Sequence, residues 1–333
     1  MVLAAGLGTR LRPITYRIPK PMAPVLNRPV MEHILRLLAR HGFTETIANL
    51  HWFPETIEGH FGDGSAFGVE LTYSHEEKLL GTSGGVRNAA PFLGDSFLVI
   101  SGDALTDIDL VAMREFHESH DGVATLATRR VEDTSQFGVA ITGADGRIQG
   151  FQEKPQPAEA LSDLANCGIY MFRSEIFDFF PAPGASEAAG PDDPPGFADW
   201  AMDVFPALLE GDAPFYSHEI DAYWNDIGNV EELRQSNFDA LRGAVAVEPG
   251  APEVSEGVRS ASPLGGAEVE APVLIGEGVE LGECARVQGP AILGDGCSVG
   301  AGAWIRDSIL LAGAELPAGA VLVGGIAGRL TES

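Results

Sequence analysis

A period of six residues dominates the last part of the chain and constrains its fold more than any other feature. Glycine and small polar residues separate apolar side chains that recur at every sixth position. One column contains Val269, Ile275, Leu281, Val287, Leu293, Val299, Ile305 and Leu311. A second column contains Val273, Val279, Ala285, Ala291, Cys297, Ala303 and Ile309. Such a short and regular period predicts stacked repeats, in which each repeat buries the apolar side of its neighbour.

These repeats resemble the hexapeptide repeats of the triangular, left-handed parallel β-helix. We expect this domain over residues 267–333, after a low-complexity linker at 243–266. Hexapeptide β-helices are often acyltransferases, whose chemistry needs a histidine base. No histidine lies beyond His218, so we expect the repeats to support assembly rather than chemistry. Cys297 is then a core residue rather than a nucleophile.

Residues 1–242 have a different pattern, which predicts an α/β domain with a mostly parallel sheet covered by helices. Short apolar runs predict strands at 1–5, 45–50, 69–73, 97–101, 123–128, 137–142 and 168–172. Helical periodicity and end signals predict helices between Pro29 and Gly42 and over 109–121. The segment 181–197 has too little side-chain bulk to pack, and we expect a mobile insertion.

The composition excludes several classes of protein. With 48 acidic and 21 basic residues, the net charge of −27 disfavours binding to nucleic acid and to anionic membrane surfaces. No apolar run approaches the roughly 18 residues of a membrane span, and no signal-peptide pattern opens the chain. We therefore expect a cytoplasmic protein. Its three cysteines lack metal spacing, so we expect no disulfide and no zinc.

A glycine turn directly follows the first apolar strand. Residues 6–10 read GLGTR, and Lys20 follows between two prolines. Backbone N–H groups of such a turn can approach a phosphate, whose charge Arg10 and Lys20 would meet. The chain has three lysines, and Lys154 also precedes a proline, which suggests that a compact point charge is needed at both places. The sequence thus predicts a triphosphate cradle, with neither P-loop nor dinucleotide-fold spacing.

Two aspartates predict a magnesium site. Asp103 follows the buried strand at 97–101, at the edge where open α/β sheets bind ligands. Asp226 lies in the aromatic segment YWNDIG at 223–228. Either one alone could be a turn or cap residue. Together with the phosphate cradle, two carboxylates and phosphate oxygens suit Mg²⁺.

The pattern Gly-x-Gly-Thr-Arg-(x)9-Lys-Pro resembles the signature of the sugar-1-phosphate nucleotidyltransferases, and the resemblance extends over about residues 1–240. It implies a Rossmann-like nucleotidyltransferase sheet and Mg²⁺ bound by Asp103 and Asp226. It implies catalytic roles for Arg10, Lys20 and Lys154. The implied nucleotide-binding residues are Leu3, Ala5, Gly6, Gly8, Thr9, Arg10, Gly81, Thr82 and Asp103. The implied sugar-phosphate-binding residues are Gly138, Glu153, Lys154 and Asn166, while Cys167 departs from the family's commoner alanine.

The segment HEEKLLGTSGG at 75–85 is similar to one found in mannose-1-phosphate guanylyltransferases. The resemblance favours GTP and mannose 1-phosphate as substrates, with UTP or dTTP and glucose 1-phosphate as the alternative. A non-catalytic regulatory homologue, like the nucleotidyltransferase-like subunits of the translation initiation exchange factor, usually lacks part of the Arg, Lys and Asp set that is complete here. We expect a homo-oligomer formed through the β-helix. Family members carry a few residues before the first strand, which leaves open a start upstream of Met1.

Overall fold

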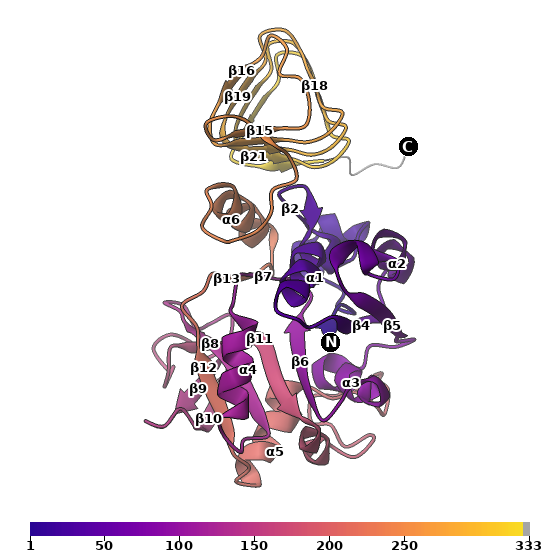
Figure 1. The fold of residues 1–333 in the computed structure, drawn as a ribbon, viewed down its shortest axis with the longest axis vertical. Helices are drawn as coiled ribbons and strands as arrows, with labels where there is room; N and C mark the ends of the chain where they lie inside the picture. Colours follow the sequence, from indigo (N-terminus) through magenta and orange to yellow (C-terminus); the bar gives the residue numbers. More distant parts are fainter. Residues whose placement is uncertain (329–333) are drawn as a thin grey trace. The chain divides into compact units, whose positions relative to one another are not determined.

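The computed structural model of the chain describes residues 1–328 (Figure 1). Their contacts form two compact units. The first unit comprises Met1–Leu7, Ile34–Ala104 and Ile108–Trp224. The second comprises Gly8–His33, Leu105–Asp107 and the chain from Asn225 onward. The expected division at 1–242, 243–266 and 267–333 follows chain order instead, and it stays a prediction.

The first unit is built on a nine-stranded sheet. Its main path has the order β10-β9-β11-β6-β1-β4-β5, and β8 pairs with both β11 and β12. The strands are β1 Val2–Leu3, β4 Glu45–Leu50, β5 Glu70–His75, β6 Ser96–Ser101, β8 Ala124–Arg130, β9 Gly138–Thr142, β10 Ile148–Glu153, β11 Leu164–Arg173 and β12 Phe215–Glu219. All seven strands expected from the sequence are present, whereas β10 and β12 were not anticipated.

The sheet is rich in parallel pairs but mixed. Strands β6, β1, β4 and β5 are adjacent in this order and pair in parallel with one another, as expected. Strand β11 is antiparallel to β6 and β8, and β9 is antiparallel to β10. Parallel neighbours need a long crossover connection, usually a helix. No helix separates β8, β9, β10 and β11 along the chain, so these strands return as antiparallel neighbours.

Two of the six α-helices within residues 1–328 were predicted. The helices are α1 Val30–Arg40, α2 Pro54–Phe61, α3 Gly81–Asn88, α4 Leu110–Glu118, α5 Phe205–Glu210 and α6 Val230–Leu241. Helix α4 begins after Asp109, whose carboxylate accepts hydrogen bonds from Val111 N and Ala112 N, both 3.0 Å long. This side-chain cap is the signal from which α4 was expected.

The segment 181–197 packs against the first unit, contrary to expectation. The Arg87 guanidinium donates hydrogen bonds to Pro181 O and Gly196 O, each 2.8 Å long. The Asp203 carboxylate accepts hydrogen bonds from Ser186 Oγ and Glu187 N. Backbone polar groups therefore hold this segment where side-chain volume is small, and the expectation that it could not pack was wrong.

In the second unit, strands between Glu253 and Ala327 form what we call the C-terminal strand array. Its members are β14 Glu253–Ser255, β15 Val258–Ser260, β16 Glu268–Glu270, β17 Val273–Ile275, β18 Glu280–Leu281, β19 Arg286–Leu293, β20 Ser298–Val299, β21 Trp304–Leu310, β22 Glu315–Leu316, β23 Val321–Val323 and β24 Ile326–Ala327. Glu268 pairs with Arg286, and Arg286 pairs with Trp304, all in parallel strands. Each step spans three hexapeptides. Strand β15 pairs with β17, so the array begins within the residues expected to form the linker.

The apolar columns slip by one residue at Asp307. Ala291 pairs with Ser308, one residue earlier than a strict period requires. Asp307 adopts a left-handed conformation with φ of 49°. Leu310 therefore continues the column after Leu293, and the predicted Leu311 was wrong. Ser308 likewise replaces the predicted Ile309 in the second column. Cys297 lies in the core, as predicted.

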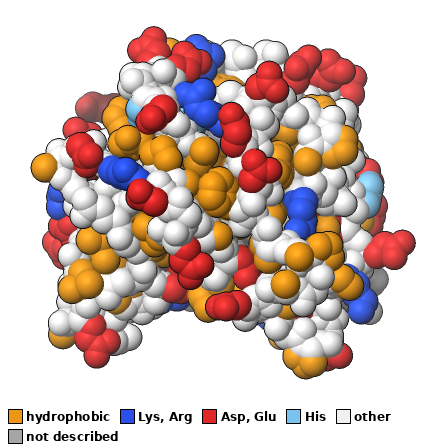
Figure 2. Space-filling model, turned by 90° about the horizontal axis from the view of Figure 1, so that it is seen from below, with side chains coloured by type: hydrophobic (Ala, Val, Ile, Leu, Met, Phe, Trp, Pro, Cys, Tyr) orange, Lys and Arg blue, Asp and Glu red, His pale blue; other side chains and the backbone are white. Residues whose placement is uncertain are grey.

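Acidic side chains are spread over the face drawn in Figure 2, where lysine and arginine appear in small separate groups. This agrees with the net charge of −27. Within residues 1–328, no helix is long and apolar enough to cross a membrane.

Candidate active site

The carboxyl ends of β1 and β6 form one edge of the sheet in the first unit. Leu3 pairs with Ser101, and Gly102 N donates a 2.9 Å hydrogen bond to Leu3 O. Asp103 therefore follows the carboxyl end of β6, next to the carboxyl end of β1. Open α/β sheets bind ligands at such an edge. The structure thus places Asp103 where the sequence predicted it.

The four residues expected to bind the sugar phosphate lie on neighbouring strands: Gly138, Glu153, Lys154 and Asn166. Glu153 pairs directly with Gly138 across β9 and β10. Ala165, next to Asn166, pairs with Val139 across β11 and β9. The strand registers therefore bring residues almost 30 positions apart in the sequence to one end of the sheet.

Glu153 and Lys154 form an ion pair at the end of β10. Lys154 Nζ lies 2.6 Å from Glu153 Oε1, and Lys154 adopts the left-handed region with φ of 47°. Residues with a side chain rarely adopt this conformation, and it often marks a functional position. A Cβ atom on Gly138 would lie 2.5 Å from the Phe151 ring and 2.9 Å from Glu153 Oε2. Any side chain at position 138 would therefore displace the Glu153 carboxylate.

The Asn166-Cys167-Gly168 segment packs against the end of β6. Asn166 Oδ1 accepts a 3.1 Å hydrogen bond from Gly168 N. A Cβ atom on Gly168, whose φ is 69°, would lie 2.6 Å from Ser101 Oγ. The Trp224 indole donates a 2.9 Å hydrogen bond to Cys167 O. Burial raises the pKa of the Cys167 thiol, so this cysteine packs as a neutral side chain.

Gly81 and Thr82 open helix α3, where another segment covers the helix terminus. Ser83 N and Gly84 N both donate 3.1 Å hydrogen bonds to Ala198 O. Thr82 Oγ1 donates a 2.8 Å hydrogen bond to a carboxylate oxygen of Asp199. The N–H groups of Ser83 and Gly84, in the first turn of α3, are therefore used within the protein and do not form the phosphate cradle.

A buried hydrogen-bond network, which the sequence analysis did not predict, links Leu80, just before α3, to Ala4, just after β1. Asn49 accepts a 2.9 Å hydrogen bond from Ala4 N and donates a 2.8 Å bond to Glu76 Oε1. Glu76 Oε2 accepts a 2.9 Å bond from Leu80 N. Burial raises the pKa of Glu76, against the lowering effect of these hydrogen bonds. The signal was present in the sequence, since Asn49 interrupts the buried apolar strand TIANL at 46–50.

In the second unit, the glycine turn packs directly on the segment that carries Lys20. Gly8 has φ of 60°, and Thr9 starts a short 3-10 turn. A Cβ atom on Gly8 would lie 2.9 Å from Thr15 Cγ2 and 3.0 Å from Lys20 Cβ. Thr15 Oγ1 donates a 2.7 Å hydrogen bond to Gly8 O. Both the conformation and the close packing therefore require glycine at position 8.

The same unit brings Arg10, Lys20 and Asp226 into one neighbourhood. Lys20 Nζ lies 3.6 Å from Asp226 Oδ1, with the lysine side chain 13% and the aspartate 32% exposed. A Cβ atom on Gly228 would lie 3.5 Å from Arg10 Nη2. Two cations predicted to meet phosphates thus lie beside the aromatic Asp226 segment.

A metal-binding role for Asp103 and Asp226 stays a prediction, because these residues belong to different units. Within residues 1–328, no group of three or more His, Cys, Asp or Glu could hold a metal ion. A site with two carboxylates and substrate oxygens would not need such a group. Asp226 Oδ1 lies 3.6 Å from Lys20 Nζ, so a metal ion bound by Asp226 would share this carboxylate with the ammonium.

Comparison with known proteins decides the family. Residues 1–242 match the family described as nucleotidyl transferase. The chain belongs to this family. The prediction from the glycine and lysine motifs is thereby confirmed.

Two curated relatives of this nucleotidyltransferase carry different substrate names. A UTP–glucose-1-phosphate uridylyltransferase of Synechocystis is 38% identical, over 97% of this chain and 85% of the relative. A mannose-1-phosphate guanylyltransferase of Mycobacterium tuberculosis is 35% identical, over 86% of this chain and 77% of the relative. A solved putative glucose-1-phosphate thymidylyltransferase of Bacillus anthracis superposes with a TM-score of 0.63 at 26% identity, covering 74% of this chain and 95% of that one.

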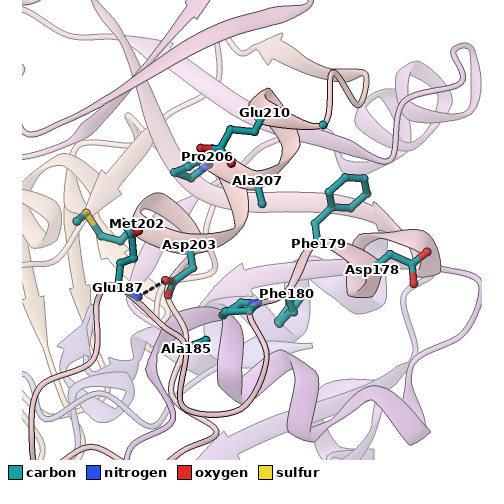
Figure 3. Close-up of a pocket in the computed structure, with 12 residues that line it drawn as sticks. Asp178, Phe179, Phe180, Ala185, Glu187, Met202, Asp203, Pro206, Ala207 and Glu210 are labelled. Carbon is teal, nitrogen blue, oxygen red and sulfur yellow. Dashed lines mark hydrogen bonds between the residues drawn. The ribbon is translucent and has the colours of Figure 1, made fainter.

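A separate groove of about 560 Å³ lies in the first unit of the nucleotidyltransferase (Figure 3). The 181–197 segment and α5 supply much of its lining, including Glu187, Pro206 and Glu210. Figure 3 shows the hydrogen bond from Glu187 N to Asp203 that shapes one wall. None of the residues lining this groove is a predicted site residue.

Proposed function

We propose that this nucleotidyltransferase joins GTP to mannose 1-phosphate, giving GDP-mannose and pyrophosphate. The observation that carries the proposal is the sheet edge at which Asp103 follows β6 beside the end of β1, while Glu153 pairs with Gly138. One end of this edge would take the nucleotide and the other the sugar phosphate. The guanylyltransferase relative and the segment at 75–85 support the choice of base and sugar.

The reaction needs no general base, because the phosphate of a sugar 1-phosphate is already an anionic nucleophile. One of its oxygens attacks the α-phosphorus of the triphosphate, and the bond from that phosphorus to the pyrophosphate oxygen breaks. Catalysis then depends on alignment and on stabilising the developing charge. Lys154 would hold the attacking phosphate, and Glu153 the sugar hydroxyls. Arg10 and Lys20 would stabilise the leaving pyrophosphate.

The proposal includes Mg²⁺ held by Asp103 and Asp226. Bound there, the ion would neutralise charge on the phosphate groups. Gly8, Thr9 and the backbone at Leu3, Ala5 and Gly6 would bind the nucleotide, together with Gly81 and Thr82.

A second candidate pairs UTP or dTTP with glucose 1-phosphate, and the uridylyltransferase relative favours UTP. A panel of five nucleoside triphosphates against mannose and glucose 1-phosphates, read by pyrophosphate release, separates the candidates. We expect the highest kcat/KM for GTP with mannose 1-phosphate, and Lys20→Ala as the inactive control. Release from UTP and glucose 1-phosphate alone would select the second candidate. No release from any pair would favour a non-catalytic homologue.

We further propose that the C-terminal strand array is a left-handed parallel β-helix through which the protein forms a homo-oligomer. The three-hexapeptide offset of 18 residues that recurs in the parallel pairs from β16 to the first part of β21 supports the first part. Two exposed valines on β23 support the second, since Val321 is 62% and Val323 is 44% exposed.

A further inference from the structure

A tight hairpin follows Lys20 in the second unit. Its strands are β2 Pro24–Val25 and β3 Arg28–Pro29. The two turn residues, Leu26 and Asn27, have φ of 49° and 63°. Positive φ at both positions is the mark of a type I′ turn. Val30 N donates a 2.9 Å hydrogen bond to Ala23 O and closes the hairpin, so its path from Lys20 is short and fixed.

Helix α6 holds the tip of this hairpin through Asn237. Asn237 Oδ1 accepts a 2.9 Å hydrogen bond from Leu26 N, and Asn237 Nδ2 donates a 2.9 Å bond to Pro24 O. The Asn237 residue is 1% exposed. Helix α6 also follows Asp226 closely, because it begins at Val230. One helix therefore connects the hairpin tip to the carboxylate that faces Lys20.

The C-terminal strand array holds the same tip through Asn27. Asn27 Nδ2 donates a 2.8 Å hydrogen bond to Leu293 O at the end of β19. A Cβ atom on Gly276 of the array would lie 2.3 Å from Asp295 Oδ1, 2.8 Å from Asp295 N and 3.0 Å from Asn27 Nδ2, so Asn27 packs closely beside a glycine of the array. The array, the hairpin and α6 are thus joined by side-chain amides at one point.

We propose that Asn27 and Asn237 are positioning residues, through which the C-terminal strand array keeps Lys20 beside Asp226. Lys20 is connected to Asp226 in two ways. The chain from Lys20 leads into the hairpin, which Asn237 bonds to α6, the helix that follows Asp226, and Lys20 Nζ itself lies 3.6 Å from Asp226 Oδ1. Asn27 bonds the same hairpin to the array. The array then contributes to catalysis as well as to assembly. The kinetic consequence rests on the proposed function, whereas the position of Lys20 can be measured without it.

The first test measures the accessibility of Lys20 in the full-length chain. The three lysines can be followed separately by mass spectrometry after brief acetylation with acetic anhydride, with Lys78 and Lys154 as internal controls. Asn27→Gly keeps the left-handed turn and removes the amide, whereas Asn27→Asp places a carboxylate oxygen opposite Leu293 O. We expect Lys20 acetylation to rise about fivefold in Asn27→Asp, the equivalent of one net hydrogen bond. An unchanged Lys20 rate in both folded variants overturns the inference.

The second test measures kinetics of the same proteins by pyrophosphate release. We expect kcat to fall about fivefold with an unchanged KM for sugar 1-phosphate, because Lys20 faces the pyrophosphate and Lys154 the sugar phosphate. Asn88→Asp, at an exposed asparagine in the first unit, is the matched control and should change neither value. If Asn27→Asp does not fold, Asn237→Asp keeps the acceptor for Leu26 N and loses the donor to Pro24 O.

The two tests separate the inference from the proposed function. A wild-type protein that releases no pyrophosphate refutes the function, while Lys20 acetylation still decides the inference. A variant with raised acetylation and reduced kcat supports both. A raised KM for sugar 1-phosphate with an unchanged kcat and unchanged Lys20 acetylation overturns the positioning role.

Discussion

Lys154 and Lys20 each precede a proline, but their surroundings differ. Lys154 contacts the neighbouring Glu153, whereas Lys20 lies near Asp226, more than 200 residues away in the sequence. We expect Lys154→Ala to damage chiefly the use of sugar 1-phosphate, by on the order of 10²-fold or more in kcat/KM. Lys154→Arg should not restore activity, because a longer planar cation misplaces the phosphate.

Lys20→Ala should damage turnover by a similar factor. Near-normal kinetics in either alanine variant would reject its assigned role.

Buried His117 should make the folded protein less stable as the pH falls. The residue is fully buried, and its Nδ1 lies 2.9 Å from Thr125 Oγ1. Burial, followed by the nearby charges of Arg173 and His120, lowers the pKa of His117 from 6.5 to about 4. Between these two values the unfolded chain binds the extra proton and the folded chain does not. The free energy of unfolding therefore falls as pH drops through this window.

The measurement for His117 is thermal and urea unfolding between pH 7 and 4.5. In His117→Gln, the slope of unfolding free energy against pH should be shallower by up to about 1.4 kcal/mol per pH unit, the value for one proton. The carboxylates titrate in both proteins, so the difference between them isolates His117. Parallel curves for the two proteins would show that His117 is not the titrating group.

At the scale of elements, local signals predicted α1 and α4 but not α3. Helix α1 lies between a proline and a glycine, and α4 has an aspartate cap. Helix α3 reads GTSGGVRN, whose glycines disfavour a helix. A Cβ on Gly84 would lie 2.5 Å from Gly196 O, so glycine is required by a segment more than 100 residues away. Such a contact has no local signature, whereas Asn49 stands out as a polar residue within the buried apolar strand at 46–50.

We expect the packing of the 181–197 segment to depend on the Asp203 carboxylate. It accepts hydrogen bonds from Ser186 Oγ at 2.7 Å and from Glu187 N and Asp199 N at 2.8 Å. Asp203→Ala would leave these partly buried donors without their partner, at about 1 kcal/mol for each lost hydrogen bond. We expect a lower unfolding temperature and faster limited proteolysis within the segment. Asp192→Ala, at an exposed aspartate of the same segment, should behave as wild type. Equal cleavage of all three proteins would contradict the role of Asp203.

At the scale of the whole molecule, motifs in chain order predicted the family but not the grouping of its parts. Gly8, Thr9, Arg10 and Lys20 precede most of the first unit in sequence, yet their contacts group them with Asp226 and the C-terminal strand array. Periodicity identified the array because its repeats are local. It could not show that Asn27 would bond to Leu293, since that contact joins residues 266 positions apart.

Oligomerisation through the array can be tested without truncating it. Along one face, the paired residues Glu268, Arg286, Trp304 and Val321 change from charged to apolar toward β23. Val321 and Val323 are both exposed there. Burying a valine in an interface contributes about 1.5–3 kcal/mol, whereas burying an unpaired carboxylate is strongly unfavourable. The double variant Val321→Glu and Val323→Glu should therefore weaken association by 10²-fold or more, as roughly estimated from these values.

The mass in solution, measured by light scattering over a concentration series, checks this prediction. Val254→Glu is the matched control, because Val254 is 52% exposed but lies on β14 at the opposite end of the array. We expect the control to keep the wild-type mass and the double variant to shift to a smaller one. Turnover per chain should be unchanged in both, since at least one strand separates β19, which carries Leu293, from β14 and from β23. A double variant that keeps the wild-type mass would exclude β23 as the interface, and a shift in Val254→Glu alone would move that interface to the first strands of the array.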